Sequence, residues 1–229
     1  KRAVLDLNRV LHKAGQAFDT TMSLSNYVST GLSPVRSRDL IQAAETHDAN
    51  PFFPIFSAKL EALFAEKEPD LVGMSINFMS QALCAFAMMG FLKKRCPQTG
   101  IICGGGLVTS WMHIPGFKNP FEGLVDKLVS GPGEETLLHI CGGAASDEAP
   151  GMSYDFMSLP WDRYLAAGRV LPYSTSQGCY WRKCAFCPEK AENSAYRPME
   201  APVVAAELRS MTTSGAPRLI HFLDNALSP

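Results

Sequence analysis

One short stretch constrains what this chain can fold into and bind more than any other. Residues 178–188 read Gly-Cys-Tyr-Trp-Arg-Lys-Cys-Ala-Phe-Cys-Pro and hold three of the chain's seven cysteines. Thiolates this close in sequence can converge on one metal centre, and the spacing C-x4-C-x2-C supplies three ligands from one loop. A structural zinc site prefers four ligands. An iron–sulfur cluster with one iron left open to a small molecule therefore fits the three cysteines better.

The other four cysteines lie far from this loop in the sequence: Cys84, Cys96, Cys103 and Cys141. Three of them fall in apolar segments, where a thiol packs like a small hydrophobic side chain. We therefore assign metal ligation to Cys179, Cys184 and Cys187 alone.

At this loop the chain resembles the radical S-adenosylmethionine (radical SAM) enzymes, whose three cysteines hold a 4Fe-4S cluster and leave its fourth iron to S-adenosylmethionine. Phe186 matches the aromatic residue of that loop, and Cys184-x2-Cys187 matches its second gap. The first gap is one residue longer than the usual C-x3-C. The motif Gly-Cys-Tyr-Trp-x-x-Cys-x-Phe-Cys-Pro is similar to the cysteine loop of radical SAM proteins that carry an N-terminal cobalamin-binding domain.

The preceding part of the chain has the alternation of an α/β fold. Short apolar runs at 71–76, 100–103 and 125–130 alternate with helical patterns at 57–67, 81–94 and 133–138. Apolar runs between helices are typical of buried parallel strands. The alternation predicts a Rossmann-like, doubly wound sheet, whose ligand crevice lies at the carboxyl ends of the strands.

The first fifty residues carry less information. Residues 1–8 form an apolar, strand-like run, and we expect that the chain is a fragment that lacks the first strand of this sheet. The polar stretch 23–34 predicts a loop, and 37–46 predicts a short helix.

Small and polar residues gather at the predicted carboxyl ends of the strands. Glycine there lets a ligand approach the backbone and leaves N–H groups free to bind it. No G-x-G-x-x-G opens the first of these helices, which argues against a nicotinamide site. The candidate binding residues are Ser75, Asn77, Gly104, Gly105, Gly106, Thr109, Gly131, Gly133 and Glu134.

These stretches resemble parts of cobalamin-binding domains. Gly73-Met74-Ser75 and residues 105–110 are similar to the Ser-x-Leu and Gly-Gly stretches that surround the nucleotide tail of the corrinoid, with Asn77 in place of leucine. Residues 131–137 resemble the Gly-x-Gly-Glu-x-x-Leu turn of radical SAM proteins with this domain. No Asp-x-His-x-x-Gly segment occurs, so the resemblance implies a corrinoid without histidine on cobalt.

A stretch rich in glycine, alanine, serine and aspartate, 142–151, marks a domain boundary. We expect a cobalamin-binding-like domain at 1–141, a linker at 142–170 and the start of a radical SAM (β/α) barrel at 171–229. Barrel strands are predicted at 171–177 and 219–225, with a helix at 203–211. The cysteine loop then follows the first strand, where such barrels place chemistry.

The end of the second barrel strand offers a site for S-adenosylmethionine. In radical SAM enzymes this position contacts the methionine amino group, and the resemblance gives the role to Asp224 and Asn225. The alternative is a polar strand end that caps the next helix.

The charge and hydrophobicity of the chain limit the classes of molecule that it can bind. A net charge of -1, with no basic run longer than Lys93-Lys94-Arg95, argues against nucleic acid and anionic membranes. The longest apolar run, 82–92, has 11 residues and is too short to span a bilayer. An odd number of cysteines without a visible leader indicates a reducing, cytoplasmic setting.

The resemblance thus implies part of a B12-dependent radical SAM enzyme that uses a 4Fe-4S cluster, S-adenosylmethionine and cobalamin. Its expected reaction is radical methyl transfer to an unactivated carbon, although relatives of this kind also rearrange rings. A reductant such as flavodoxin or ferredoxin would serve it, with a small molecule or peptide as substrate. No catalytic residue is assigned, and we expect this fragment alone to be inactive.

Two other functions remain open. One is a non-catalytic carrier of a corrinoid or other small ligand, with zinc in the cysteine loop. The other is a methylthiotransferase-like radical SAM enzyme acting on RNA, whose front domain carries cluster cysteines of its own.

Overall fold

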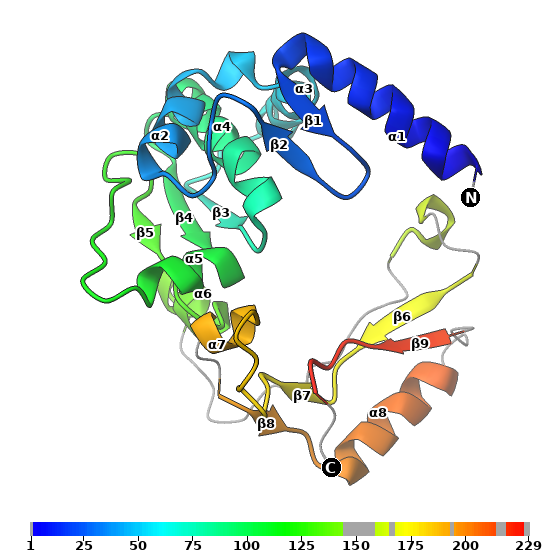
Figure 1. Cartoon of the computed structure of the whole chain (residues 1–229). Helices are drawn as coiled ribbons and strands as arrows, with labels where there is room; N and C mark the ends of the chain where they lie inside the picture. Colours follow the sequence, from blue (N-terminus) through cyan, green and yellow to red (C-terminus); the bar gives the residue numbers. More distant parts are fainter. Residues whose placement is uncertain (1, 144–158, 165–167, 193–194, 214–218, 227–229) are drawn as a thin grey trace. The chain divides into compact units, whose positions relative to one another are not determined.

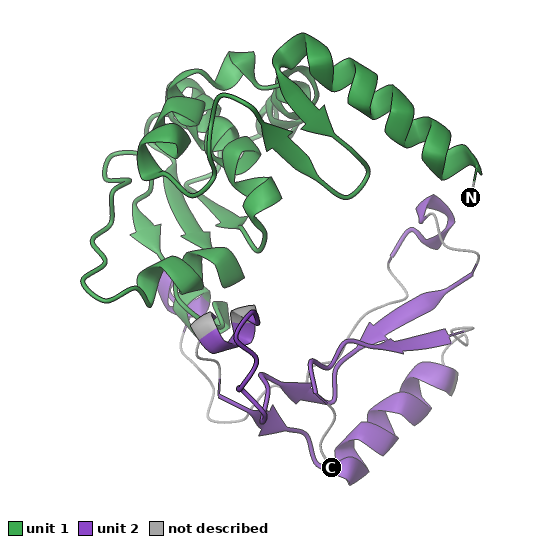
Figure 2. Cartoon of the chain, viewed as in Figure 1, with its two compact units in different colours: residues 1–137 green, residues 138–229 purple. Residues whose placement is uncertain are grey.

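The computed structural model describes residues 2–143, 159–164, 168–192, 195–213 and 219–226. The chain divides into two compact units, residues 1–137 and 138–229 (Figure 2). The sequence predicted a domain boundary between residues 141 and 142. We call these parts the first unit and the second unit and describe each by itself.

A parallel sheet lies in the first unit. Strands β3 (Leu71–Ser75), β4 (Gly100–Gly104) and β5 (Lys127–Leu128) pair in the order β3-β4-β5 (Figure 1). Helix α4 (Met79–Arg95) connects β3 to β4, α5 (Gly106–Met112) follows β4, and α6 (Glu134–Ile140) begins after β5. This confirms the predicted mixed α/β class with a parallel sheet.

The core of the first unit forms around α4, which is apolar on most sides. Its buried residues are Ala82, Leu83, Phe86, Ala87, Met89 and Leu92. Helix α2 (Ser37–Glu45) packs against it so closely that a Cβ atom on Gly90 would lie 1.9 Å from the carbonyl oxygen of Ala44. Glycine is therefore required at position 90 for the two helices to approach.

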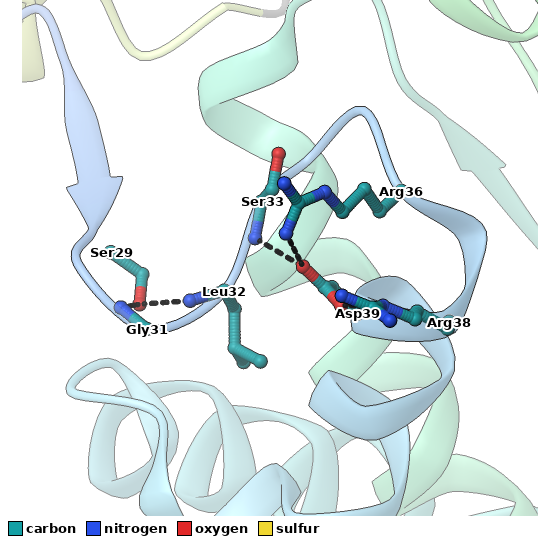
Figure 3. Close-up of polar contacts among 7 residues, drawn as sticks. All are labelled: Ser29, Gly31, Leu32, Ser33, Arg36, Arg38 and Asp39. Carbon is teal, nitrogen blue, oxygen red and sulfur yellow. Dashed lines mark hydrogen bonds and ion pairs between the residues drawn. The ribbon is translucent and has the colours of Figure 1, made fainter.

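A buried carboxylate fixes the loop that leads into α2. Asp39 accepts hydrogen bonds from the Ser33 amide (3.0 Å) and the Arg38 guanidinium (3.1 Å), and Arg36 lies 3.9 Å away (Figure 3). The hydrogen bond from Ser33, assisted by the two arginines, holds the pKa of Asp39 below its ordinary value. The predicted helix at 37–46 is thereby confirmed as α2, with a defined start.

A second carboxylate ties the sheet to α4. Asp126 accepts hydrogen bonds from Lys93 Nζ (2.9 Å) and from the Ile101 amide (2.7 Å). Lys93, and next the Ile101 amide, lower the pKa of Asp126. Because Asp126 directly precedes β5, these bonds anchor a strand of which only two residues are paired.

The helix α3 (Phe53–Phe64) follows the short turn η2 (His47–Ala49) and starts four residues before its predicted first residue. Its Phe53 and Phe56 rings contact Phe91 of α4, at centroid distances of 5.8 and 6.2 Å. These contacts add α3 to the layer of helices around α4.

Two predictions for the first thirty residues are wrong. The segment taken as a strand is the helix α1 (Arg2–Gly15), because Val4, Leu7 and Leu11 recur at helical spacing over a window longer than the one considered. The predicted loop contains β2 (Tyr27–Ser29), which pairs antiparallel with β1 (Thr20–Met22), the latter preceded by the turn η1 (Gln16–Phe18). Three-residue strands depend on their partner and leave little pattern in the sequence.

The second unit contains a parallel strand pair. Strands β6 (Val170–Tyr173) and β9 (Leu219–Phe222) align Val170 with Leu219 and Tyr173 with Phe222, and α8 (Ala201–Thr213) lies between them in sequence. The Tyr173 hydroxyl donates to the Glu207 carboxylate of α8 at 2.8 Å. The turn η3 (Trp161–Arg163) precedes this pair.

The predicted continuous strand at 171–177 is two strands. Strand β6 pairs with β9, and the chain then turns away from β9. The short strand β7 (Ser176–Gln177) that follows pairs antiparallel with β8 (Arg197–Pro198). The break occurs because the Thr175 amide donates to the side chain of Asp224 and not to a neighbouring strand. The predicted strand at 219–225 likewise ends at Phe222.

Within the described residues, no helix meets the length and hydrophobicity needed to cross a membrane.

Candidate functional site

A cavity of about 400 Å³ opens at the carboxyl ends of β3, β4 and β5 in the first unit. Small-molecule sites typically measure about 300–1,000 Å³ and often lie at this edge of an α/β sheet. Predicted binding residues that line it are Ser75, Gly104, Gly105, Gly131, Gly133 and Glu134. Its other lining residues are Gly73, Met74, Ile102, Val129 and Leu137. Gly73, Met74 and Leu137 belong to stretches that resemble parts of the family, whereas the sequence did not single out Ile102 and Val129.

Three predicted binding residues connect the turns around the cavity and do not line it. The Asn77 side chain accepts a hydrogen bond from the Gly106 amide (2.9 Å) and donates to Ser75 Oγ (3.4 Å). Thr109 Oγ1 accepts from the Gly131 amide (2.9 Å) and donates to the Gly105 carbonyl (3.0 Å). Asn77, Gly106 and Thr109 therefore act by holding the turns in place.

These bonds correct one part of the sequence interpretation. Glycine turns were expected to leave their N–H groups free for a ligand. The expectation is wrong for Gly106 and Gly131, because nearby side chains already accept their amide hydrogens.

Gly105 has a packing role that no other residue can fill. Its φ is +100°, and a Cβ atom at this position would lie 2.6 Å from the carbonyl oxygen of Ile76. The turn after β4 thus packs directly on the turn after β3, and the Ile76 amide donates to the Gly104 carbonyl at 2.8 Å. The close approach fixes the two turns that form one side of the cavity.

The cysteine loop lies in the second unit, between β7 and α7 (Pro188–Glu192). Cys179, Cys184 and Cys187 are half-buried and free of disulfides. Gly178, which opens the loop, has a φ of +70°. The Tyr180 ring packs on Tyr196 with centroids 5.5 Å apart, whereas the Phe186 side chain is 89% exposed.

The three thiols suit an iron–sulfur cluster by their chemistry but are not gathered. In the described parts of the chain, no set of three or more His, Cys, Asp or Glu side chains is placed to hold a metal ion. Ligation by all three cysteines would therefore require the loop to draw their sulfur atoms together.

Three of the other four cysteines, Cys84, Cys96 and Cys103, have surroundings unsuited to ligation, whereas Cys141 is exposed. Cys96 and Cys103 are buried, and burial raises the pKa of Cys103 to about 12. Burial also raises the pKa of Cys84 to about 11. Since the thiolate is the form that binds a metal, these thiols are poor ligands as they stand.

Asp224 and Asn225 hold the two flanks of the cysteine loop. Asp224 accepts hydrogen bonds from the Thr175 amide (2.9 Å), the Thr175 hydroxyl (2.8 Å) and the Ser176 hydroxyl (2.7 Å), all just before the loop. The Asn225 side-chain amide donates to Glu189 of α7, just after the loop. The predicted contact of Asp224 with an amino group would compete with these internal bonds.

Two buried polar atoms near the loop lack partners within the described structure: Glu189 Oε2 and the Tyr196 hydroxyl. A buried polar atom without a partner costs about 1–3 kcal/mol, so each suggests a ligand or water. Sequence reasoning missed Glu189. Its signal was a carboxylate two residues after the last cysteine.

Comparison with known protein families, curated proteins and solved structures finds no match for this chain.

Proposed function

We propose that the chain is part of a cobalamin-dependent radical SAM enzyme. The observation that carries the proposal is the C-x4-C-x2-C loop, whose three free thiols follow a strand segment of a parallel strand–helix–strand unit. Such units are the repeating element of (β/α) barrels, whose reactive residues stand on the loops after the strands. The pairing of β6 with β9 is compatible with the start of a barrel.

In this proposal Cys179, Cys184 and Cys187 ligate a 4Fe-4S cluster. When bound, the reduced cluster supplies an electron that cleaves S-adenosylmethionine, and methylcobalamin supplies the methyl group. The exposed ring of Phe186 covers the apolar side of the cofactor site. Asp224 holds the base of the loop, and the carboxylate of Glu189, steadied by Asn225, receives the amino group of S-adenosylmethionine.

The cavity of the first unit takes the nucleotide tail of the corrinoid. Its place at the carboxyl ends of parallel strands and its volume support this role. Cobalt then carries no histidine from this chain. The reductant would be a flavodoxin or ferredoxin, the substrate a small molecule or peptide, and the reaction methyl transfer to carbon.

One rival function draws on a specific observation. The cavity is built entirely within the first unit, so a carrier of a corrinoid or other small ligand, with zinc in the loop, could use it without radical chemistry. The methylthiotransferase alternative is less well supported, because Cys96 and Cys103 are buried and cannot readily ligate a second cluster.

Anaerobic reconstitution with iron and sulfide, followed by titration with hydroxocobalamin, tests the proposal. We expect bound iron and sulfide, with visible absorption from the cluster, and saturable corrinoid binding. Zinc in place of iron would favour the carrier. Absence of both iron and corrinoid binding would refute the proposal.

A further inference from the structure

The cavity of the first unit offers few donors to an anion. Phosphate sites usually consist of free backbone N–H groups, often with a basic side chain. Here the Gly106 and Gly131 amides already donate to Asn77 and Thr109, each at 2.9 Å. No lysine, arginine or histidine is among the residues that line the cavity.

Negative charge already stands beside the cavity, in the first turn of α6. Glu134 and Glu135 are the acidic residues of this turn. Glu134 lines the cavity and, among the described residues, its carboxylate has no hydrogen-bond or ion-pair partner. A phosphate entering the cavity would approach this carboxylate, and like charges repel.

The other walls suit a flat apolar group. Met74, Ile102, Val129 and Leu137 supply hydrophobic surface, and the glycines leave room beside the backbone. Ser75 and Glu134 are the lining residues with polar side chains. The Glu134 carboxylate, which is exposed to solvent, can exchange a water molecule for a hydroxyl or N–H donor of a bound ligand.

We infer that this cavity selects an uncharged ring that bears a hydroxyl or N–H donor and rejects a ligand that brings a phosphate into it. The identity of this ring rests on the proposed function. If the chain binds cobalamin, the base and ribose of the cobalamin tail enter the cavity and the phosphodiester stays outside. The same selectivity excludes free nucleotides as competing ligands.

Calorimetric titration of the 229-residue chain with three probes tests the inference. The probes are the riboside of 5,6-dimethylbenzimidazole, adenosine and adenosine 5′-monophosphate. Both nucleosides should bind, and the monophosphate should bind about tenfold more weakly than adenosine because of its repulsion by Glu134.

Reversing one charge sharpens the test. Glu134→Lys should reverse the preference, so that the monophosphate binds more tightly than adenosine. Glu66→Lys is the matched control, because Glu66 is exposed, unpaired among the described residues and absent from the cavity wall. Glu66→Lys should still bind adenosine more tightly than adenosine 5′-monophosphate, as the wild type does.

Three results would overturn the inference: no nucleoside binding, equal affinity of the wild type for adenosine and its monophosphate, or an unchanged ratio in Glu134→Lys. Failure of hydroxocobalamin to bind while the nucleoside preference persists would instead refute the proposed corrinoid function alone.

Discussion

The carboxylate of Asp224 accepts hydrogen bonds from both the amide and the hydroxyl of Thr175, at 2.9 and 2.8 Å. The parallel ladder ends where Tyr173 aligns with Phe222, so this side chain extends the connection between β6 and β9 beyond the ladder. Burial by itself would raise the pKa of Asp224, but the hydrogen bonds from Thr175 and Ser176 outweigh it and lower the pKa. Asp224 thus fixes Thr175 and Ser176, the residues that lead into the cysteine loop.

Replacing Asp224 with asparagine should loosen this support. Hydrogen bonds to a charged group contribute about 1.5–3 kcal/mol, so we expect faster hydrogen exchange at the Thr175 amide and at neighbouring amides. Because the folded pKa is lowered, the contribution is present above the unfolded pKa of about 3.9 and is lost as pH falls through the folded value. The wild type should therefore lose protection on acidification, and the variant should not.

The control is Asp162→Asn, which changes an exposed aspartate of the same unit. It should leave exchange at Thr175 unchanged. Equal exchange in wild type and Asp224→Asn at neutral pH would show that the carboxylate does not support the strand end.

Gly105→Ala should destabilise the first unit strongly. The substitution combines a φ of +100° with a Cβ atom 2.6 Å from the Ile76 oxygen, so we expect a loss of at least about 2–4 kcal/mol in urea unfolding. Gly116→Ala is the matched comparison, since Gly116 has a φ of +74° with nothing within 4 Å of its Cβ position. It should cost only about 1 kcal/mol. Equal costs would mean that the two turns do not pack as described.

Gly73→Leu should block the cavity without damaging the fold. Gly73 lines the cavity, and a Cβ atom there meets nothing within 4 Å. We expect hydroxocobalamin affinity to fall by about tenfold or more, as a filled pocket excludes the ligand tail. Gly31→Leu adds the same side chain at an equally open position outside the cavity and should bind normally. Unchanged affinity in Gly73→Leu would place corrinoid binding elsewhere.

Glu189→Gln should weaken S-adenosylmethionine binding to the reconstituted chain while leaving cluster absorption intact. The variant keeps the shape of the side chain but removes the charge that pairs with an ammonium group, so we expect an affinity loss of about tenfold. 5′-Methylthioadenosine lacks that group and should bind wild type and variant equally.

Glu200→Gln, which alters an exposed carboxylate ahead of α8, serves as the control for Glu189→Gln. It should not affect binding. If Glu189→Gln binds S-adenosylmethionine like the wild type, the unpartnered carboxylate oxygen has another purpose.

The sequence was most informative where a pattern is local and repeated. Apolar runs and helical spacing predicted β3, β4 and α4, and glycines after the strands predicted much of the cavity wall. It failed for α1, where eight residues are too few to separate a helix from a strand. It also could not foresee that Asn77 and Thr109 would accept the Gly106 and Gly131 amide hydrogens, because those pairs are joined only by the fold.

The same limit applies around the cysteine loop. The spacing of the cysteines is visible in the sequence, but the support of the loop by Asp224 and Asn225 depends on the pairing of β6 with β9, far apart in the chain. For that reason the sequence suggested only a cofactor contact for Asp224 and gave no sign of its hydrogen bonds with Thr175 and Ser176.

The central claim is that three cysteines of one loop hold an iron–sulfur cluster with an open iron. The most direct test is iron and sulfide analysis after anaerobic reconstitution of the wild type and of single cysteine-to-alanine variants. We expect about four iron atoms per wild-type chain, loss of the cluster in Cys179→Ala, Cys184→Ala and Cys187→Ala, and full retention in Cys84→Ala and Cys141→Ala. A wild type that binds zinc and no iron, or a cluster that survives loss of any of the three loop cysteines, would contradict the account.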